Sequence, residues 1–365
     1  MTKELTTINP EVANERFKND DGDWWHTNAN SETKKLLVSP KTMQPYKEGD
    51  TILTGKYKGK IFSQYRYDRY LSIKDKNYWG IKTRLVSENL SKDVAGYRIP
   101  TPAVISFSGG RTSAFMLKQI LNAYNGKLPE DIKVCFANTG KELPETLDFV
   151  KEVQDRWDVN IHWLELQINE ETPIWSQKEV TYETASRAGE PFDELIIKTQ
   201  RLPNLHTRTC TIEMKIKPIE RFMQSLGYEE WYSVLGLRYD EPKRVSDSRA
   251  QKRRYINLTP MYDVKHTNEH VLDFWDKNNF DLKIPTIDGK AAAGNCDLCF
   301  LKGMKTTLQI MHERPDLAAW WVEKEAILER SFRQGRPNYI SLLNLSKEAP
   351  KEYLDDDSFT CFCHD

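Results

Sequence analysis

A glycine turn flanked by hydroxyl side chains is the first feature of this chain that could carry chemistry. An apolar run from Ala103 to Phe107 leads into Ser108, Gly109 and Gly110, and a segment with helical spacing of apolar residues follows. Glycine lacks Cβ, so backbone there can approach a ligand closely, and the start of a helix attracts anions. The turn is predicted to hold a phosphate or pyrophosphate, with a plain surface turn as the alternative. The expected lining residues are Ser106, Ser108, Gly109, Gly110, Arg111, Thr112 and Ser113.

A second polar turn, Asn138-Thr139-Gly140, follows the next strand candidate, Ile132–Ala137. Pro144 then suits the first turn of a helix, which would present Glu145 near this turn. The turn is a candidate for nucleotide contact, although an ordinary connection between a strand and a helix would look similar.

Two further segments combine cations with a cysteine or a glycine. His206 to Pro218 holds Arg208, Cys210, Lys215 and Lys217, which could neutralise phosphate or sulfate or form a solvated face. The strand candidate Tyr232–Leu237 contains Gly236 and is followed by Arg238 and Arg244, whose planar guanidinium groups suit oxyanions.

The order of these four segments resembles that in sulfonucleotide (phosphoadenosine-phosphosulfate, PAPS) reductases, which belong to the adenine-nucleotide α-hydrolase superfamily. The first resembles the superfamily's pyrophosphate loop, and the second resembles a DTG…PET segment in which Asn138 replaces the usual Asp. The third and fourth resemble R-x-C-x-x-x-x-K-x-x-P and G-x-R-x-x-E-x-x-R, over a total span of roughly Ala103 to Cys299. The resemblance implies an adenine nucleotide (ATP, APS or PAPS), bound by the turns above with Arg208, Gly236 and Arg244, and catalytic roles for Lys215 and Arg238.

Cysteines supply the other candidate centre. Cys296 and Cys299 form a CxxC that is similar to the one in cluster-bearing sulfonucleotide reductases, where a Cys-Cys pair precedes it. Here Thr209 occupies one position of that pair and leaves Cys210 alone. A fourth thiolate from the C-terminal tail would complete a [4Fe–4S] cluster, and the same four ligands could instead bind zinc.

The tail offers two cysteines for two roles. Reductases of this family carry a nucleophilic cysteine near the C-terminus, ahead of a His. We assign Cys363 to the metal centre and Cys361 to attack on sulfur, although His364 next to Cys363 argues for the reverse. An inert tail is the alternative. Cys135, in an apolar strand candidate, is expected to be a buried small hydrophobe.

Alternation of strand and helix patterns from Ala103 onward predicts an α/β fold with a doubly wound parallel sheet. We expect three parts: an accessory, β-rich module over residues 1–100, a nucleotide-binding core over 101–290, and a CxxC-containing helical segment with a cysteine-rich tail over 291–365. Basic and aromatic residues interleave from Lys56 to Arg84, and Arg249, Lys252, Arg253 and Arg254 form a second cluster, which makes nucleic acid a candidate partner. The slightly favoured alternative is that the aromatic residues are the core of a small β module and the charged residues its rim.

Composition narrows the class of protein. The net charge is −1 and 39% of the 365 residues are hydrophobic, which gives no overall bias toward polyanions and ample material for a core. No run is long and apolar enough for a membrane span, so we expect a cytoplasmic protein with no membrane partner.

The leading hypothesis is a PAPS reductase-like enzyme that works with a thiol reductant. The first alternative is an ATP pyrophosphatase that transfers sulfur to DNA or tRNA, with a sulfur donor protein as partner. The second is a nucleotide-sensing, DNA-binding regulator on the same scaffold.

Overall fold

The computed structural model describes residues 16–18, 24–26, 95–171, 173–251, 253–284, 286–287, 290–291 and 296–347. The chain divides into two units, Met1–Glu88 and Asn89–Asp365. In the first unit, β1 (Arg16–Lys18) pairs antiparallel with β2 (Trp24–His26). The basic stretch from Lys56 to Arg84 and the tail cysteines lie outside the described residues. Among the helices described, none is both long and apolar enough to cross a membrane.

A six-stranded sheet forms the centre of the second unit, in the order β6-β5-β4-β3-β7-β8. All neighbouring strands run parallel except β6, which is antiparallel to β5. The α/β prediction is therefore confirmed, although β6 and β8 were not among the predicted strands. The strands are β3 (Ala103–Ser106), β4 (Ile132–Ala137), β5 (Ile161–Ile168), β6 (Trp175–Val180), β7 (Tyr232–Val234) and β8 (Ile256–Leu258).

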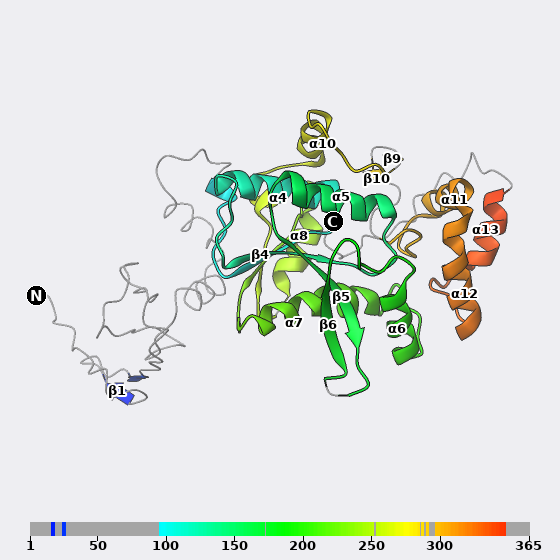
Figure 1. The fold of residues 1–365 in the computed structure, drawn as a ribbon, viewed down its shortest axis with the longest axis horizontal. Helices are drawn as coiled ribbons and strands as arrows, with labels where there is room; N and C mark the ends of the chain where they lie inside the picture. The colour runs from blue at the N-terminus through cyan, green and yellow to red at the C-terminus, as the bar shows by residue number, and fades with distance from the viewer. Residues whose placement is uncertain are drawn as a thin grey trace, which may run out of the picture. The chain divides into compact units, whose positions relative to one another are not determined.

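Helices lie on both sides of this sheet, with α4 and α5 on one side and α7 on the other (Figure 1). The helices on the core are α4 (Arg111–Ala123), α5 (Pro144–Arg156), α6 (Glu190–Thr199), the π-helical turn η3 (Thr211–Ile216), α7 (Lys217–Ser225), α8 (Pro242–Ala250), α9 (Pro260–Asp263) and α10 (Asn268–Asp276). A short hairpin of β9 (Thr286–Ile287) and β10 (Lys290–Ala291) follows. The C-terminal helices are α11 (Met304–Glu313), the 3-10 turn η4 (Pro315–Leu317), α12 (Ala318–Leu328) and α13 (Tyr339–Lys347).

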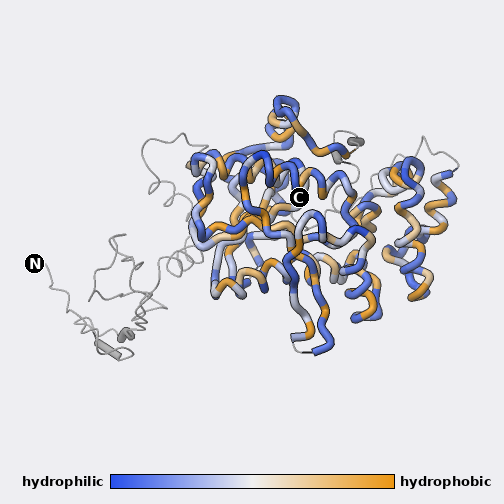
Figure 2. Tube along the Cα trace, in the orientation of Figure 1, coloured by the Kyte–Doolittle hydropathy of each residue, from blue (hydrophilic) through white to orange (hydrophobic). Residues whose placement is uncertain are grey.

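Burial explains why the central strand reads as a continuous apolar run. All four residues of β3 are buried, as expected for a parallel strand covered on both faces. The surrounding helices alternate hydrophobic and hydrophilic segments, which is the pattern of amphipathic helices (Figure 2). Cys135 packs with Val104 and Trp231 in the core and is fully buried, which confirms its expected role as a small hydrophobe.

Candidate functional site

Three of the four predicted motifs leave the sheet at one edge. Ala103 of β3 lies in register with Ile132 of β4 and with Tyr232 of β7, and all three strands run in the same direction. The turns that follow these strands therefore emerge together at the carboxyl edge of the sheet. In open α/β sheets this edge is where ligands bind.

The turn between β3 and α4 is closed by its own hydroxyl groups. The Ser108 backbone N–H donates to Ser113 Oγ at 3.2 Å, and the two hydroxyl oxygens lie 2.9 Å apart. Ser113 Oγ also donates to Gly110 O at 3.1 Å. The predicted hydroxyl groups of Ser108 and Ser113 thus shape the turn. Ser106 is buried at the end of β3.

The surroundings of the two glycines in the turn differ. Gly109 has φ +79°, and a Cβ there would lie 2.8 Å from Thr146 Cγ2 and 3.1 Å from Val150 Cγ2. Packing against α5 therefore requires Gly109. A Cβ on Gly110, the residue before the first turn of α4, would meet only Ser108 Oγ at 3.5 Å. Gly110 is the position at which a ligand could approach the backbone.

Arg238, which follows β7, reaches this turn. Its NH1 donates to Thr112 Oγ1 in the first turn of α4 at 3.4 Å. Motifs far apart in the sequence therefore meet at the N-terminus of α4. Carboxylates accompany the predicted arginines: Arg238 pairs with Asp240 and Glu241, and Arg244 also pairs with Glu241.

Other predicted ligand residues have partners within the protein. Arg111 forms a two-pronged pair with Asp281, with Nε–Oδ1 and NH2–Oδ2 distances of 2.7 and 2.5 Å. Arg208 Nε donates to Leu205 O at 3.2 Å, and Glu145 lies 3.8 Å from an Arg314 nitrogen. Gly236 is buried in the segment after β7.

Asn138 and Glu165 form the centre of a buried polar network. Asn138 Nδ2 donates to Glu165 Oε1 at 2.7 Å and to Ser186 O at 2.9 Å, and its Oδ1 accepts from Gly140 N–H. Glu165 also accepts from the backbone and hydroxyl groups of Ser186 and pairs with Lys178 at 3.2 Å. The Asn138 side chain is therefore buried in the protein interior, where its hydrogen bonds fix the turn after β4.

Lys215 belongs to a second cluster of polar residues, which lies beside Cys296. Its Nζ lies 3.6 Å from Glu142 Oε1. Glu142 Oε2 accepts from the N–H and hydroxyl groups of Thr139 at 2.8 Å each, and Thr139 Oγ1 lies 3.5 Å from Cys296 Sγ. Glu142 was missed in the sequence. Nothing in the sequence shows that this glutamate is buried or that Lys215 is its partner, so no sequence pattern marks it as a site residue.

Cys299 influences the pKa of both other described candidate thiols, Cys210 and Cys296. Burial and the neighbouring Cys299 together raise the pKa of Cys210 to about 12, against an opposing effect of Lys215. Burial also raises the pKa of Cys296 well above its usual value, with contributions from Glu142 and Cys299. All three are free thiols. Within the described residues, however, no group of three or more His, Cys, Asp or Glu side chains is arranged to hold a metal ion. These residues alone therefore do not make a ligand set.

The CxxC segment is anchored from both sides. Glu142 and Cys296 form a β-bridge, and Asp297 N–H donates to Lys141 O at 2.7 Å. The Asp297 carboxylate pairs with Lys141 Nζ at 3.0 Å and accepts from Trp321 Nε1 of α12 at 2.8 Å. Because Lys141 directly follows the turn Asn138-Thr139-Gly140, these contacts link the CxxC segment to that turn.

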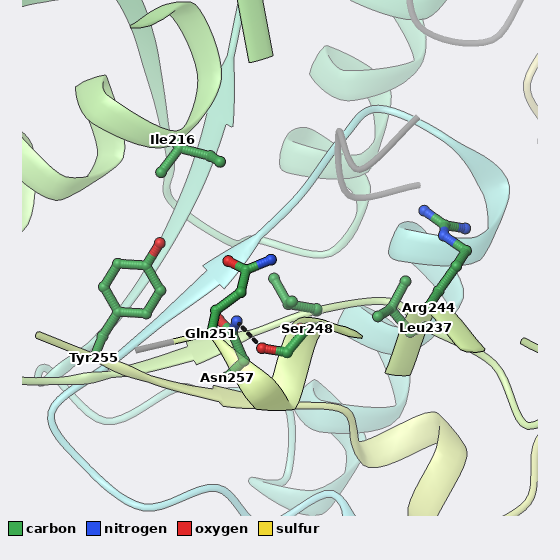
Figure 3. Close-up of a pocket in the computed structure, with 8 residues that line it drawn as sticks. Ile216, Leu237, Arg244, Ser248, Gln251, Tyr255 and Asn257 are labelled. Carbon is green, nitrogen blue, oxygen red and sulfur yellow. Dashed lines mark hydrogen bonds between the residues drawn. The ribbon is translucent and has the colours of Figure 1, made fainter. Parts of the chain in front are cut away.

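A cavity beside Arg244 is too small for a nucleotide. It is lined by Leu237 and Arg244 on one side and by Tyr255 on the other, with Ser248 and Asn257 between them (Figure 3). Its space suits about one water molecule. Ser248 Oγ and Asn257 Oδ1 are buried without a hydrogen-bond partner, which is consistent with such a water.

The basic cluster from Arg249 to Arg254 does not form a surface of unopposed charge. Arg249 pairs with Asp263 at 2.6 Å, and Arg253 pairs with Glu220 at 3.1 Å. Lys252 lies outside the described residues. This part of the chain therefore gives no support to the predicted nucleic-acid surface.

Comparison with known proteins gives one family match. Residues 102–283 match the family model "Phosphoadenosine phosphosulfate reductase domain". The uncharacterised nin region protein ORF290 of Escherichia phage lambda is 32% identical over 206 residues, which cover 54% of this chain and 66% of that protein. The phosphoadenosine 5'-phosphosulfate reductase of Erwinia tasmaniensis is 25% identical over 199 residues, which cover 53% and 63%. The match thus spans about two thirds of the length of these two relatives.

Two solved structures that the comparison finds share little sequence identity with this chain and have low TM-scores. PAPS reductase from Candida auris, in a phosphate complex, has 15% identity and a TM-score of 0.35, with 57% of this chain and 89% of that chain covered. The U34-tRNA thiolase of Methanococcus maripaludis, with its [4Fe–4S] cluster, has 12% identity and a TM-score of 0.35, with 90% and 95% covered.

Proposed function

Because residues 102–283 of this chain belong to the phosphoadenosine phosphosulfate reductase domain family, we propose that it binds an adenine nucleotide at the carboxyl edge of its sheet and reduces a sulfonucleotide there. The observation that carries this proposal is the contact from Arg238 NH1 to Thr112 Oγ1 at 3.4 Å. It joins the glycine turn and the arginine motif into one place suited to an oxyanion.

The chemistry of this place favours phosphate or sulfate. The first N–H groups of α4 lack partners within the helix and point toward the turn, where the helix dipole is positive. Gly110 leaves room for a ligand to approach, and Arg238 and Arg244 supply guanidinium groups on the same side. In this proposal, Ser108 and Ser113 hold the turn in shape, while Thr112 and Arg238 contact the anion.

The proposed reaction consumes two thiols. A thiolate, assigned to Cys361, attacks the sulfur of the sulfonucleotide, forms an S–S bond and releases the nucleotide phosphate. A second thiol then attacks the sulfur atom of the protein in that thiosulfonate, so that sulfite leaves and a disulfide forms. Two thiols are oxidised to the disulfide, and the sulfur of the sulfate group is reduced to sulfite.

The proposal includes the predicted [4Fe–4S] cluster, but the two reaction steps above do not involve it. It is supported by the effect of Cys299 on the pKa of both Cys210 and Cys296, and Cys363 is proposed as the fourth ligand. If present, the thiolate-ligated cluster would supply a redox-active group of net negative charge, for which Lys215 would be a nearby counter-ion. A Cys₄ zinc site is the alternative outcome of a metal analysis.

The full chain, purified without oxygen, tests the function directly. ATP, APS and PAPS are each supplied with a dithiol reductant, with and without DNA or tRNA, and sulfite, pyrophosphate and AMP are measured together. Sulfite from APS or PAPS without nucleic acid is the expected result. Pyrophosphate and AMP from ATP only with nucleic acid would replace the proposal with ATP-dependent sulfur transfer. Tight nucleotide binding without turnover would replace it with nucleotide sensing.

A further inference from the structure

Two adjacent carboxylates hold the arginines of the proposed anion site. Asp240 lies against the Nε and NH2 side of the Arg238 guanidinium, at 3.1 and 3.2 Å. Glu241 lies between the two arginines: one carboxylate oxygen accepts from Arg244 NH1, and the other lies 3.5 Å from Arg238 NH1. The two positive charges are therefore balanced by two negative ones.

Glu241 is built into the frame of the site. Its Oε2 also accepts from the Arg238 backbone N–H at 3.1 Å, and its own N–H donates to Arg238 O at 3.1 Å. It is the residue immediately before α8, and its side chain is only 13% exposed. A carboxylate tied to both the backbone and two guanidinium groups fixes the geometry of those groups.

Asp240 occupies a different position. Its side chain is 40% exposed. It covers the edge of Arg238 that binds an oxyanion through two parallel hydrogen bonds, which is the preferred geometry for phosphate and sulfate. Its Oδ1 also accepts from Asn268 N–H at the start of α10. An exposed carboxylate on that edge occupies the place that a ligand oxyanion would take.

We propose that Glu241 is a positioning residue that orients Arg238 and Arg244 for an oxyanion, and that Asp240 is the counter-ion that the oxyanion displaces. This inference rests on the proposed function, since it requires a nucleotide anion at this edge. It assigns opposite roles to two neighbouring carboxylates that contact the same arginine.

Opposite roles give opposite effects. The substitutions Asp240→Asn and Glu241→Gln each remove one negative charge, so general electrostatics predicts that both strengthen anion binding. The proposal predicts that only the first does so, because the second also releases the two guanidinium groups from their fixed arrangement.

Titration calorimetry of the full chain with ATP and with PAPS tests this difference. Asp240→Asn should bind about two- to fivefold more tightly, as expected from freeing one exposed ion pair. Glu241→Gln should bind about tenfold more weakly, as expected from loss of a charge-assisted contact. Asp273→Asn on α10, an exposed carboxylate paired with Lys277, changes the charge equally and should leave the affinity unchanged.

Further variants separate positioning from folding. Glu241→Asp keeps the charge and should bind more tightly than Glu241→Gln. If thermal unfolding shows that Glu241→Gln is not folded, Glu241→Asp takes its place in the comparison. Tighter binding by both Asp240→Asn and Glu241→Gln, or no gain in Asp240→Asn, overturns the inference while leaving the proposed function standing. Failure of the unaltered chain to bind either nucleotide removes the proposed function itself.

Discussion

The side-chain amide of Asn138 donates to the fully buried carboxylate of Glu165 at 2.7 Å. This contact explains the residue type at position 138. Glu165 accepts hydrogen bonds from Asn138 and from two groups of Ser186, so its neighbours must be donors. The Asp that is common in the resembling reductases would place a second acceptor there.

Asn138→Asp should therefore make stability strongly dependent on pH. The introduced carboxyl would be buried beside another carboxylate, so its folded-state pKa is raised above its unfolded value near 4. The folded state then binds more protons than the unfolded state, and stability falls as pH rises through that interval. We expect little loss near pH 4 and a loss of about 3–5 kcal/mol at pH 7, the scale of an uncompensated buried charge. Urea unfolding at both pH values measures it.

The double variant Asn138→Asp with Glu165→Gln restores one donor opposite one acceptor. It should recover a large part of the stability lost at pH 7, because the Gln amide can donate to the new carboxylate. A double variant as unstable as the single one would show that the loss has another origin.

Gly110→Ala should weaken nucleotide binding without unfolding the protein. The added Cβ meets only Ser108 Oγ at 3.5 Å, so the cost in stability should be limited to the poorer N-cap, about 0.5–1 kcal/mol, while the methyl group blocks ligand approach. We expect at least a tenfold loss of affinity, measured by calorimetry.

Gly109 makes a poor test of the same turn. A sequence-based argument predicts that Gly109→Val removes binding and leaves the fold intact, but its Cβ would clash with Thr146 and the backbone has positive φ. The packing around Gly109 argues against an intact fold, and we expect lowered thermal stability from any side chain at this position. An equally stable Gly109→Val protein would contradict the packing argument.

The buried pair Lys141 and Asp297 should behave as a unit. Lys141→Met or Asp297→Asn alone should cost about 3–5 kcal/mol, because each leaves a buried partner without its counter-charge. The double variant should recover much of that loss, since it removes both charges and leaves neither uncompensated. Chemical denaturation of the four proteins gives the coupling energy, and additive losses would argue against the pair.

Iron content tests the role of the cysteines. Protein prepared without oxygen should hold about four iron atoms per chain if the [4Fe–4S] cluster forms. Cys296→Ser and Cys299→Ser should remove the iron, whereas Cys135→Ala, in the core of β4, should keep it. A colourless protein with one zinc per chain would exclude the cluster.

Much of the fold followed from local patterns. The predicted strands before the glycine turn and before Asn138 are present because continuous apolar runs suit buried parallel strands. The half-buried, antiparallel β6 was not predicted because its sequence, Trp175–Val180, is mostly polar and carries no clear alternation. Strand β8, Ile256–Leu258, was not predicted because three residues are too few to show a strand pattern.

The candidate site was predicted only in part. Glycines and arginines mark an anion site by residue type alone, and the contact between Arg238 and Thr112 agrees with that interpretation. Their counter-charges, such as Asp281 for Arg111 and Glu142 for Lys215, come from distant segments or lack a motif. Sequence patterns report what a residue can do, whereas ion pairing depends on which side chains the fold brings together.

The sheet order also determines when the site can form during folding. The glycine turn follows β3, but its partner arginine follows β7, and β3 pairs with β7 only after β4, β5 and β6 have been passed along the chain. Such pairing between distant segments is slow, because loop closure must precede the gain from contact. A nascent chain that has not yet reached Tyr232 contains the turn without its arginines. Nucleotide would therefore add stability late, once the core is assembled, and would not act as a template for its early steps.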